Sequence, residues 1–305
     1  MEIRMTAADS GRSVLDYLLK NMKLSTRSLR RLKYTEGGIT VNGESVTVRR
    51  VLREGDILRL DVGDRESSEN VIPRRLPVDV LFEDGEIIAV NKPADMPTHP
   101  SHGHLDDTLA NALAFKAAVR GERFVFRPAN RLDRNTSGIV LVAKDQISAC
   151  RLFEQMRAGS VKKTYIAILD GVPSVLRGTV DAPIARADEV GLATIVCADT
   201  VSDEGREAHT EYNVVATSPD KKHSLVVLRP LTGRTHQLRV HMAHLGCPIL
   251  GDFLYGKESP LLPRHALHAA RLEFDHPADG RRMLVSSPLP DDMAALCEML
   301  FSERN

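Results

Sequence analysis

Hydrophobic and polar positions along the chain change their period several times, and each change predicts an element. Residues 39–48, ITVNGESVTV, alternate on both sides of Asn42-Gly43, which is a strong hairpin signal. Residues 78–93, VDVLFEDGEIIAVNKP, predict two strands joined by a turn at Asp84-Gly85. The run GIVLVAK at 138–144 is almost wholly apolar, so it predicts a strand buried on both faces.

The helical period follows directly after that run. Asp145 is placed to cap a helix that Gly159 ends. Four residues at i, i+3, i+4 and i+7 are predicted to form its inward face: Ala149, Leu152, Phe153 and Met156. The next segment, KKTYIAILDG, is predicted to be a strand.

The second half of the chain repeats the mixture of strands and helices. Residues 223–230, HSLVVLRP, predict a strand, and LTGR after it predicts a turn. A helix is predicted over 235–246, with Leu238, Met242 and Leu245 inward. Because these elements do not follow a regular βαβ repeat, the sequence predicts an α+β fold.

Residues 1–63 differ in character and are predicted to form a small domain of two helices and a compact β-unit. Ser25 is placed as the N-cap of a helix in a stretch rich in basic residues and free of acids. The predicted RNA contacts of this domain are Arg27, Arg30, Arg31 and Lys33. A solvated charged face explains the same residues equally well. Residues 64–77 are predicted to be a linker, and 78–305 a larger domain.

Composition narrows the class of protein. The chain has 305 residues and zero formal net charge, which argues against a polycation that binds nucleic acids or membranes non-specifically. It shows no apolar leader and no apolar run near the ~20 residues of a membrane span. Its four cysteines contain no C-x-x-C pair. The sequence therefore predicts a protein of the reduced cytoplasm, without structural zinc or membrane contact.

Two histidine clusters, HPSHGH (99–104) and HQLRVHMAH (236–244), raise the question of a metal site. Neither has H-E-x-x-H or a comparable ligand spacing, so ordinary loop and helix histidines are favoured. The chain also lacks a P-loop, a dinucleotide fingerprint and a G-x-S-x-G elbow. We expect no metal and no cofactor.

Asp133 is the candidate with the most unusual surroundings. It lies between Arg131 and Arg134 in RPANRLDRNTSG, just before the predicted buried strand. On local sequence alone, a turn cap paired with one of these arginines is favoured. A charged carboxylate at the edge of the core, in basic surroundings, is suited instead to act on a polyanion that the arginines attract.

Four segments in order resemble one family. RPANRLDRNTSGIVLVAKD resembles the H-R-L-D-x-x-T-S-G motif of the RluA-type pseudouridine synthases. EIIAVNKPADMPTHP resembles the family's first motif, KKTYIAIL its tyrosine motif, and LTGRTHQLRVHMAHLGCPILGD its C-terminal motif. Residues 1–63 resemble the S4 domain that many members carry in front. The resemblance implies an S4-like αβ module followed by a catalytic domain with a mixed, mainly antiparallel sheet flanked by helices and loops.

The resemblance also implies a reaction and residue roles. The family isomerises uridine in RNA to pseudouridine: the N1–C1′ bond breaks, the uracil turns over, and C5 bonds to C1′, without cofactor or metal. Asp133 would be the essential catalytic residue, and Arg239 would pair with it. Tyr165 would stack on the flipped uracil, and Arg131 would enter the space that the base leaves. Without the resemblance, Tyr165 is better explained as a core tyrosine of a strand.

One departure from the family pattern is Asn130, where histidine is usual. The Arg-Leu-Asp core is intact, so we expect the chemistry to survive. Large-subunit ribosomal RNA is the expected substrate because of the S4-like segment, with transfer RNA as the alternative. A non-catalytic RNA-binding or assembly factor is the rival from another class. We expect a monomer.

Overall fold

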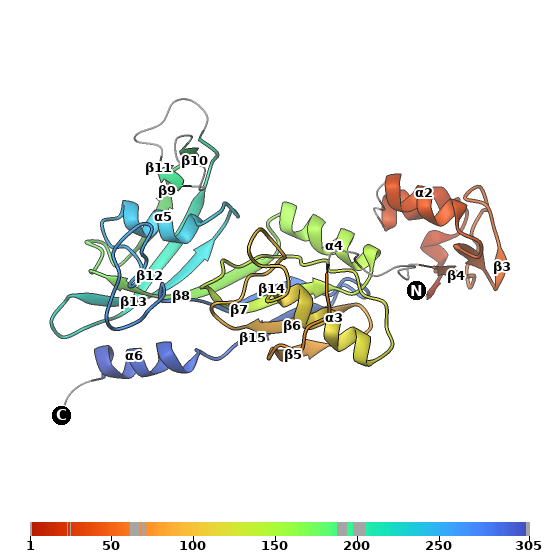
Figure 1. The fold of residues 1–305 in the computed structure, drawn as a ribbon. Helices are drawn as coiled ribbons and strands as arrows, with labels where there is room; N and C mark the ends of the chain where they lie inside the picture. Colours follow the sequence, from red (N-terminus) through yellow and green to blue (C-terminus); the bar gives the residue numbers. More distant parts are fainter. Residues whose placement is uncertain are drawn as a thin grey trace.

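A mixed sheet of nine strands runs through the larger part of the molecule (Figure 1), in the order β5-β6-β7-β14-β8-β13-β12-β9, with β15 beside β14. Its strands are β5 (Asp79–Glu83), β6 (Ile87–Lys92), β7 (Ser137–Ala143), β8 (Lys162–Asp170), β9 (Arg177–Asp181), β12 (His209–Thr217), β13 (His223–Pro230), β14 (Leu267–Asp275) and β15 (Arg282–Ser286). β14 and β7 run parallel, and the other pairs are antiparallel. The predicted α+β class with a mixed, mainly antiparallel sheet is confirmed.

The computed structural model describes residues 2–22, 24, 26–61, 68, 71–187, 194–197 and 205–302. The larger helices are α3 (Leu109–Val119), α4 (Gln146–Arg157), α5 (Gln237–His244) and α6 (Asp291–Phe301). β10 (Ile184–Ala187) and β11 (Thr194–Cys197) form a separate two-stranded sheet. Within the described part of the chain, none of the helices is long and apolar enough to span a membrane.

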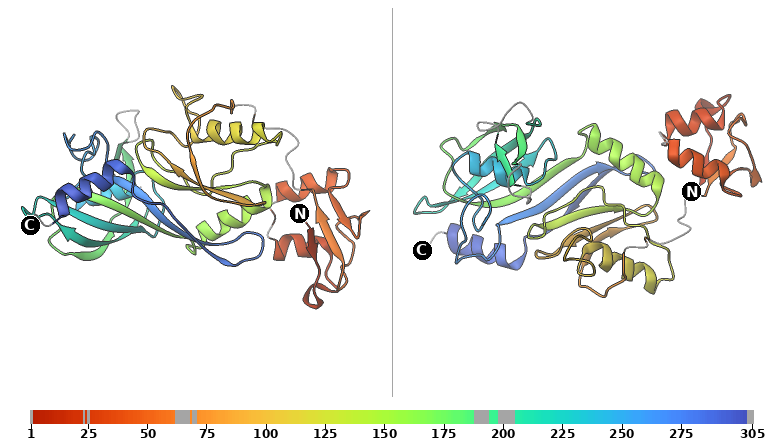
Figure 2. Two further views of the ribbon diagram at one scale, coloured as in Figure 1. Left: turned by 90° about the horizontal axis from the view of Figure 1, so that it is seen from below. Right: turned by 45° about the horizontal axis from the view of Figure 1, so that its top comes forward.

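β7 is buried on both faces, as its apolar run predicts. Val140 and Val142 pack in the cluster that holds Leu109 and Leu113 of α3. The residues that alternate with them, including Leu141, point to the other face and pack in a cluster with Leu152 of α4. The period of two in a strand sends successive side chains to opposite faces. β7 therefore lies between two helices on opposite faces of the sheet (Figure 2), and residues 127–129 of the chain before it hydrogen-bond to its last residues.

α4 begins and ends where the sequence predicts. The carboxylate of Asp145 accepts hydrogen bonds from the backbone N–H groups of Ile147 and Ser148. Leu152 is fully buried beneath the helix. The prediction of an inward Phe153 was wrong, because 61% of that residue is exposed. With Leu152 and Ile147 facing the core, the next position along the helix is turned by about 100° toward the surface.

The N-terminal part, residues 2–61, has its own small sheet and apolar cluster. Its elements are β1 (Glu2–Arg4), η1 (Ala7–Asp9), α1 (Val14–Asp16), η2 (Tyr17–Asn21), α2 (Thr26–Tyr34), β2 (Ile39–Val41), β3 (Glu44–Ser45) and β4 (Ile57–Leu60). The predicted hairpin is confirmed: Val41 pairs with Glu44, and Asn42 and Gly43 both have positive φ, of 53° and 85°. This is the signature of a type I′ turn. β1 was not predicted, and the Ser25 cap lies outside the described residues.

The predicted linker is described only at residue 68 and at 71–77. Its described end lies against α3, where the side chain of Asn111 donates to the carbonyl of Ile72 at 2.8 Å. The backbone N–H of Arg74 donates to the carbonyl of Asn111 at 3.1 Å. The boundaries at 63 and 77 and the likeness to an S4 domain stay predictions.

Candidate active site

A cavity of about 920 Å³ opens where the loop before β7 meets β8 and the start of α5. Its lining includes all four predicted catalytic residues: Arg131, Asp133, Tyr165 and Arg239. They come from three separate stretches of sequence, which the sheet order β7-β14-β8-β13 brings close together. A cavity of this size suits a small ligand or one extruded nucleotide.

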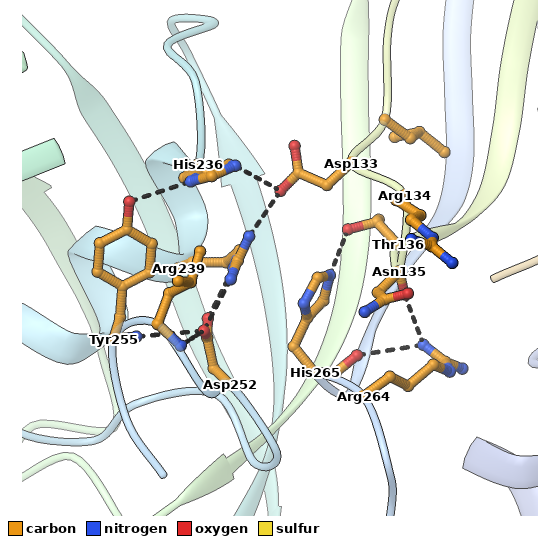
Figure 3. A network of polar contacts seen from close by, with 12 residues as sticks. Asp133, Arg134, Asn135, Thr136, His236, Arg239, Asp252, Tyr255, Arg264 and His265 are labelled. Atoms are coloured by element: carbon orange, nitrogen blue, oxygen red, sulfur yellow. Dashed lines mark hydrogen bonds and ion pairs between the residues drawn. The ribbon is translucent and has the colours of Figure 1, made fainter. Parts of the chain in front are cut away.

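Asp133 and Arg239, which both line this cavity, contact each other (Figure 3). Nη1 of Arg239 donates to Oδ2 of Asp133 at 3.2 Å. Nε and Nη2 of Arg239 donate to the two oxygens of Asp252, at 2.7 and 2.8 Å. Asp252 is fully buried and also accepts the backbone N–H groups of Leu254 and Tyr255. Arg239 is thus fixed on one edge by Asp252 and offers its remaining nitrogen to Asp133.

The electrostatics of this pair keep the guanidinium charged. Burial opposes the charge of Arg239, but the hydrogen bond and charge of Asp252, with the charge of Asp133, raise its pKa. Burial would raise the pKa of Asp252, yet the hydrogen bonds and charge of Arg239 hold it below its usual value. The Asp133 side chain stays 29% exposed beside this buried ion pair, so it is open to a ligand.

His236 faces Asp133 from a second direction. Its Nε2 lies 3.7 Å from Oδ2 of Asp133, and its Nδ1 lies 3.0 Å from the hydroxyl of Tyr255. Burial lowers the pKa of His236 despite the opposing charge of Asp133, which favours the neutral ring. Since a carboxylate only accepts, the neutral ring directs its Nε2–H toward Asp133, and the Tyr255 hydroxyl donates to Nδ1. His236 also has a left-handed backbone, with φ of 54°. Such strain at a bulky residue is typical of functional sites.

The loop that carries Asp133 is held through its backbone carbonyls. The hydroxyl of Thr98 donates to the carbonyl of Leu132 at 2.9 Å. Nζ of Lys92 donates to the carbonyl of Arg134 at 3.0 Å, and Nη1 of Arg264 donates to that of Asn135 at 3.2 Å. Burial lowers the pKa of the Lys92 ammonium to about 7, against the charge of Asp133. Side chains from distant segments therefore position this loop.

The local pairing of Asp133 with its neighbours is not what the structure shows. Arg134 turns to the surface, where it pairs with Asp95 at 2.7 Å and contacts His104 at 3.1 Å. Arg131 is exposed at the cavity mouth. The carboxylate of Asp133 pairs instead with an arginine 106 residues away.

Tyr165 lies in β8 and is only 9% exposed. Its position fits a core tyrosine of a strand and also a residue of the site wall. It packs in the apolar cluster and lines the cavity. Burial and the charge of Asp133 raise its pKa. The ring is therefore a neutral, apolar wall of the cavity.

Asn130 acts as an extra link to the buried strand. Its Nδ2 donates to the carbonyl of Ile139, and its Oδ1 accepts the backbone N–H of Leu141, both at 2.9 Å.

Gly138 lies at the start of β7. It has φ of 115°, and a Cβ there would lie 2.3 Å from the carbonyl oxygen of Ala269. The glycine is needed because β7 and β14 approach closely beside the Asp133 loop.

Three histidines of the two clusters make ordinary contacts. His99 packs on Phe126, His104 contacts Asp107, and His241 is buried against Thr210 and the carbonyl of Ala182. Among the described residues, one group of three has ligand atoms close enough to share a metal ion: Asp84, Glu86 and His276. These three do not line the cavity.

The predicted RNA contacts of α2 lie apart from the cavity. Arg30 and Lys33 are exposed, whereas Arg31 is half-buried and donates to the side chain of Gln146 in α4 at 3.3 Å. The side chain of Arg27 lies outside the described part of the structure. Ile147 of α4 joins the apolar cluster of the N-terminal part. The first turn of α4 therefore contacts this N-terminal part (Figure 2).

Sequence reasoning missed four residues that shape the site: Lys92, His236, Asp252 and Tyr255. His236 was seen only as one member of a histidine cluster. Asp252 stands at the end of the segment CPILGD, where a single acid after a glycine gives little signal. Its role appears only once Arg239 is seen to need a second partner.

Comparisons with known proteins identify the family of this chain. The model of the RNA pseudouridylate synthase family matches residues 86–244. The Bacillus subtilis protein named uncharacterized RNA pseudouridine synthase YjbO is 37% identical over 273 residues, 90% of this chain and 94% of that protein. The ribosomal large subunit pseudouridine synthase D of Zymomonas mobilis is 40% identical over 247 residues, 76% of each chain.

A solved structure shares the fold as well. Human RNA pseudouridylate synthase domain containing 1 superposes with a TM-score of 0.60 at 29% identity, covering 70% of this chain and 84% of that one. The matched family model spans the segment that carries both Asp133 and Arg239. Sequence and fold both match, and the chain belongs to the RluA-type RNA pseudouridine synthases, enzymes that isomerise uridine within RNA.

Proposed function

We propose that this enzyme isomerises specific uridines of large-subunit ribosomal RNA, with Asp133 as the essential catalytic residue. The observation that carries the proposal is the ion pair between Asp133 and Arg239 inside the cavity that Tyr165 lines. A partly exposed carboxylate with a fixed cation beside it is available to the ribose or the base of a bound nucleotide. The names of the relatives from Zymomonas mobilis and Xanthomonas campestris support the ribosomal substrate.

The reaction needs the uridine outside the RNA stack. C1′ and C5 of a stacked base are out of reach, so extrusion into the cavity costs a few kcal/mol. Tyr165 offers the ring face on which the uracil rests, since its phenol is neutral and lies against the core. The exposed guanidinium of Arg131 at the cavity mouth takes the place of the base that leaves the stack.

The chemical step takes place beside the carboxylate of Asp133 and the guanidinium of Arg239. The N1–C1′ bond breaks and its electron pair leaves with the uracil. The uracil rotates and C5 bonds to C1′; a base then takes the proton from C5 and N1 gains a proton, so the isomerisation is neutral overall. Arg239 keeps a positive charge beside the carboxylate throughout, because Asp252 holds it from the other edge. Preorganised charge of this kind stabilises developing charge without reorganisation of the site.

The N-terminal part would anchor the RNA and leave the choice of uridine to the cavity. The exposed Arg30 and Lys33 of α2 suit phosphate contacts, which position RNA without reading its sequence. Affinity should then fall with rising salt.

Tritium release from RNA labelled at uridine C5 tests the proposal. Unmodified large-subunit ribosomal RNA and transfer RNA are offered separately, and the product is mapped by carbodiimide primer extension. Release from the ribosomal RNA at defined positions is the expected result. Release from transfer RNA alone would replace the proposed substrate, and RNA binding without release from either would favour a non-catalytic RNA-binding factor.

A further inference from the structure

Phe153 exposes an aromatic ring to the active-site cavity. It lines the cavity from α4, and 61% of it is exposed. A phenylalanine ring exposed in the wall of a cavity is available to pack against a bound ligand, which would bury its apolar surface. Phe153 lies outside the Asp133 network, whose members come from other elements. Its position is therefore separate from the chemistry already assigned.

Two cationic side chains, Arg157 and Lys163, line the same cavity as this ring. Met156 and Arg157 follow Phe153 at i+3 and i+4, on the same side of α4, and both line the cavity. Arg157 is exposed, and Lys163 lines the cavity at the start of β8. An apolar ring face beside a guanidinium suits a nucleotide, because the base stacks on the ring and the phosphate meets the cation.

The position along α4 indicates which part of an RNA would lie there. The first turn of this helix contacts the N-terminal part through Ile147 and Gln146. Phe153 and Arg157 lie farther along, where the helix reaches the cavity. An RNA held by the basic face of α2 and inserted at Asp133 therefore passes along α4.

We propose that Phe153 stacks on a base adjacent to the flipped uridine and that Arg157 contacts the phosphate of that same nucleotide. This inference rests on the proposed action on RNA and adds a specificity-determining contact to it. The contact favours uridines whose neighbour is itself unstacked, as in a loop or bulge, since a paired base cannot turn onto the ring.

The test compares Phe153→Ala with wild type in steady-state tritium release. Whichever of large-subunit ribosomal RNA and transfer RNA the wild type modifies is used, cut to the shortest active fragment. We expect kcat/KM to fall about tenfold, equivalent to about 1.4 kcal/mol, mainly through KM. Phe153→Tyr keeps a stacking ring and should retain the wild-type value. Val119→Ala removes an exposed apolar side chain of α3 that does not line the cavity, and should also behave as wild type.

An abasic substitution in the RNA identifies the partner of the ring. Each neighbour of the target uridine is replaced in turn by an abasic nucleotide. At one of the two positions, Phe153→Ala should cost nothing further, because the stacking partner is already missing. An unchanged kcat/KM for Phe153→Ala, or the same loss on every abasic RNA, would overturn the stacking contact. A wild type active on transfer RNA alone would overturn only the proposed substrate, and the Phe153 comparison would still decide this inference.

Discussion

The carboxylate of Asp252 binds the guanidinium of Arg239 through two hydrogen bonds of 2.7 and 2.8 Å and leaves Nη1 of that guanidinium for Asp133. Asp252 is fully buried and does not line the cavity. It acts on the reaction only through Arg239, as a positioning residue.

Asp252→Asn should lower kcat by 10- to 100-fold and leave RNA affinity nearly unchanged. The amide offers one acceptor where the carboxylate offers two, and it removes the negative charge that balances Arg239. Breaking a buried ion pair on one side also costs about 3–5 kcal/mol of stability. Single-turnover rates and RNA binding are measured together below the unfolding temperature of the variant. A folded variant with wild-type kcat would contradict the positioning role.

His236→Asn should lower kcat about tenfold with little change in stability. Asparagine tolerates the left-handed backbone at this position, so the backbone conformation of the turn is kept while the ring beside Asp133 is lost. Tyr255→Phe removes the hydroxyl that orients the ring and should give a smaller loss. The double variant should lose no more than His236→Asn alone, because both act through one contact. Additive losses would mean that Tyr255 works independently of His236.

Asn130→His should retain turnover, whereas Asn130→Ala should lose about 1–3 kcal/mol of stability. The alanine leaves the carbonyl of Ile139 and the N–H of Leu141 without their side-chain partner at the edge of β7. The two ring nitrogens of histidine supply a donor and an acceptor in its place. Urea unfolding and tritium release distinguish the two variants. Complete inactivity of a folded Asn130→His variant would show that the amide does more than hold the strand.

Lys92 gives the enzyme a specific pH dependence of stability. Its pKa is about 7 in the folded chain and about 10.4 in an unfolded one. Between these values the unfolded chain binds more protons, so the free energy of unfolding rises with pH, by at most about 1.4 kcal/mol per pH unit. Below pH 7 both states are protonated and this contribution is constant.

Urea unfolding of wild type and Lys92→Met at pH 7.5 and 9 isolates that contribution. Wild type should gain stability relative to the variant over this interval. Titration of the lysine Cε signals by NMR in the wild type provides a check that needs no variant. A Lys92 signal that first titrates near pH 10 would contradict the prediction.

The sequence predicted several of the strands for local reasons, and its four candidate catalytic residues line one cavity. Asn42-Gly43 favours a hairpin by its backbone preference, and the apolar run GIVLVAK favours a strand buried on both faces. Asp133 and Arg239 stood in recognisable motifs. They are 106 residues apart in sequence, and the order of strands in the sheet brings them together. That order cannot be predicted from the hydrophobic period of any one segment.

The errors and omissions have equally physical origins. Phe153 fits the apolar period of α4, but a stripe of four positions is wider than the face that the sheet covers, so Phe153 is left exposed at the cavity. Lys92 is an unremarkable lysine in sequence, and its burial against three backbone carbonyls depends on how distant loops meet. Asp252 and His236 acquire their roles from partners contributed by other segments.

The central claim is that the carboxylate of Asp133 is essential for the isomerisation. Single-turnover tritium release from C5-labelled large-subunit ribosomal RNA, wild type against Asp133→Asn, tests it most directly. The substitution keeps the size of the side chain and leaves an acceptor for Arg239. We predict that RNA binding persists while release falls by at least 10⁴-fold, equivalent to about 5.5 kcal/mol in the barrier. Release within tenfold of wild type would contradict the account and move the search for the catalytic group elsewhere in the cavity.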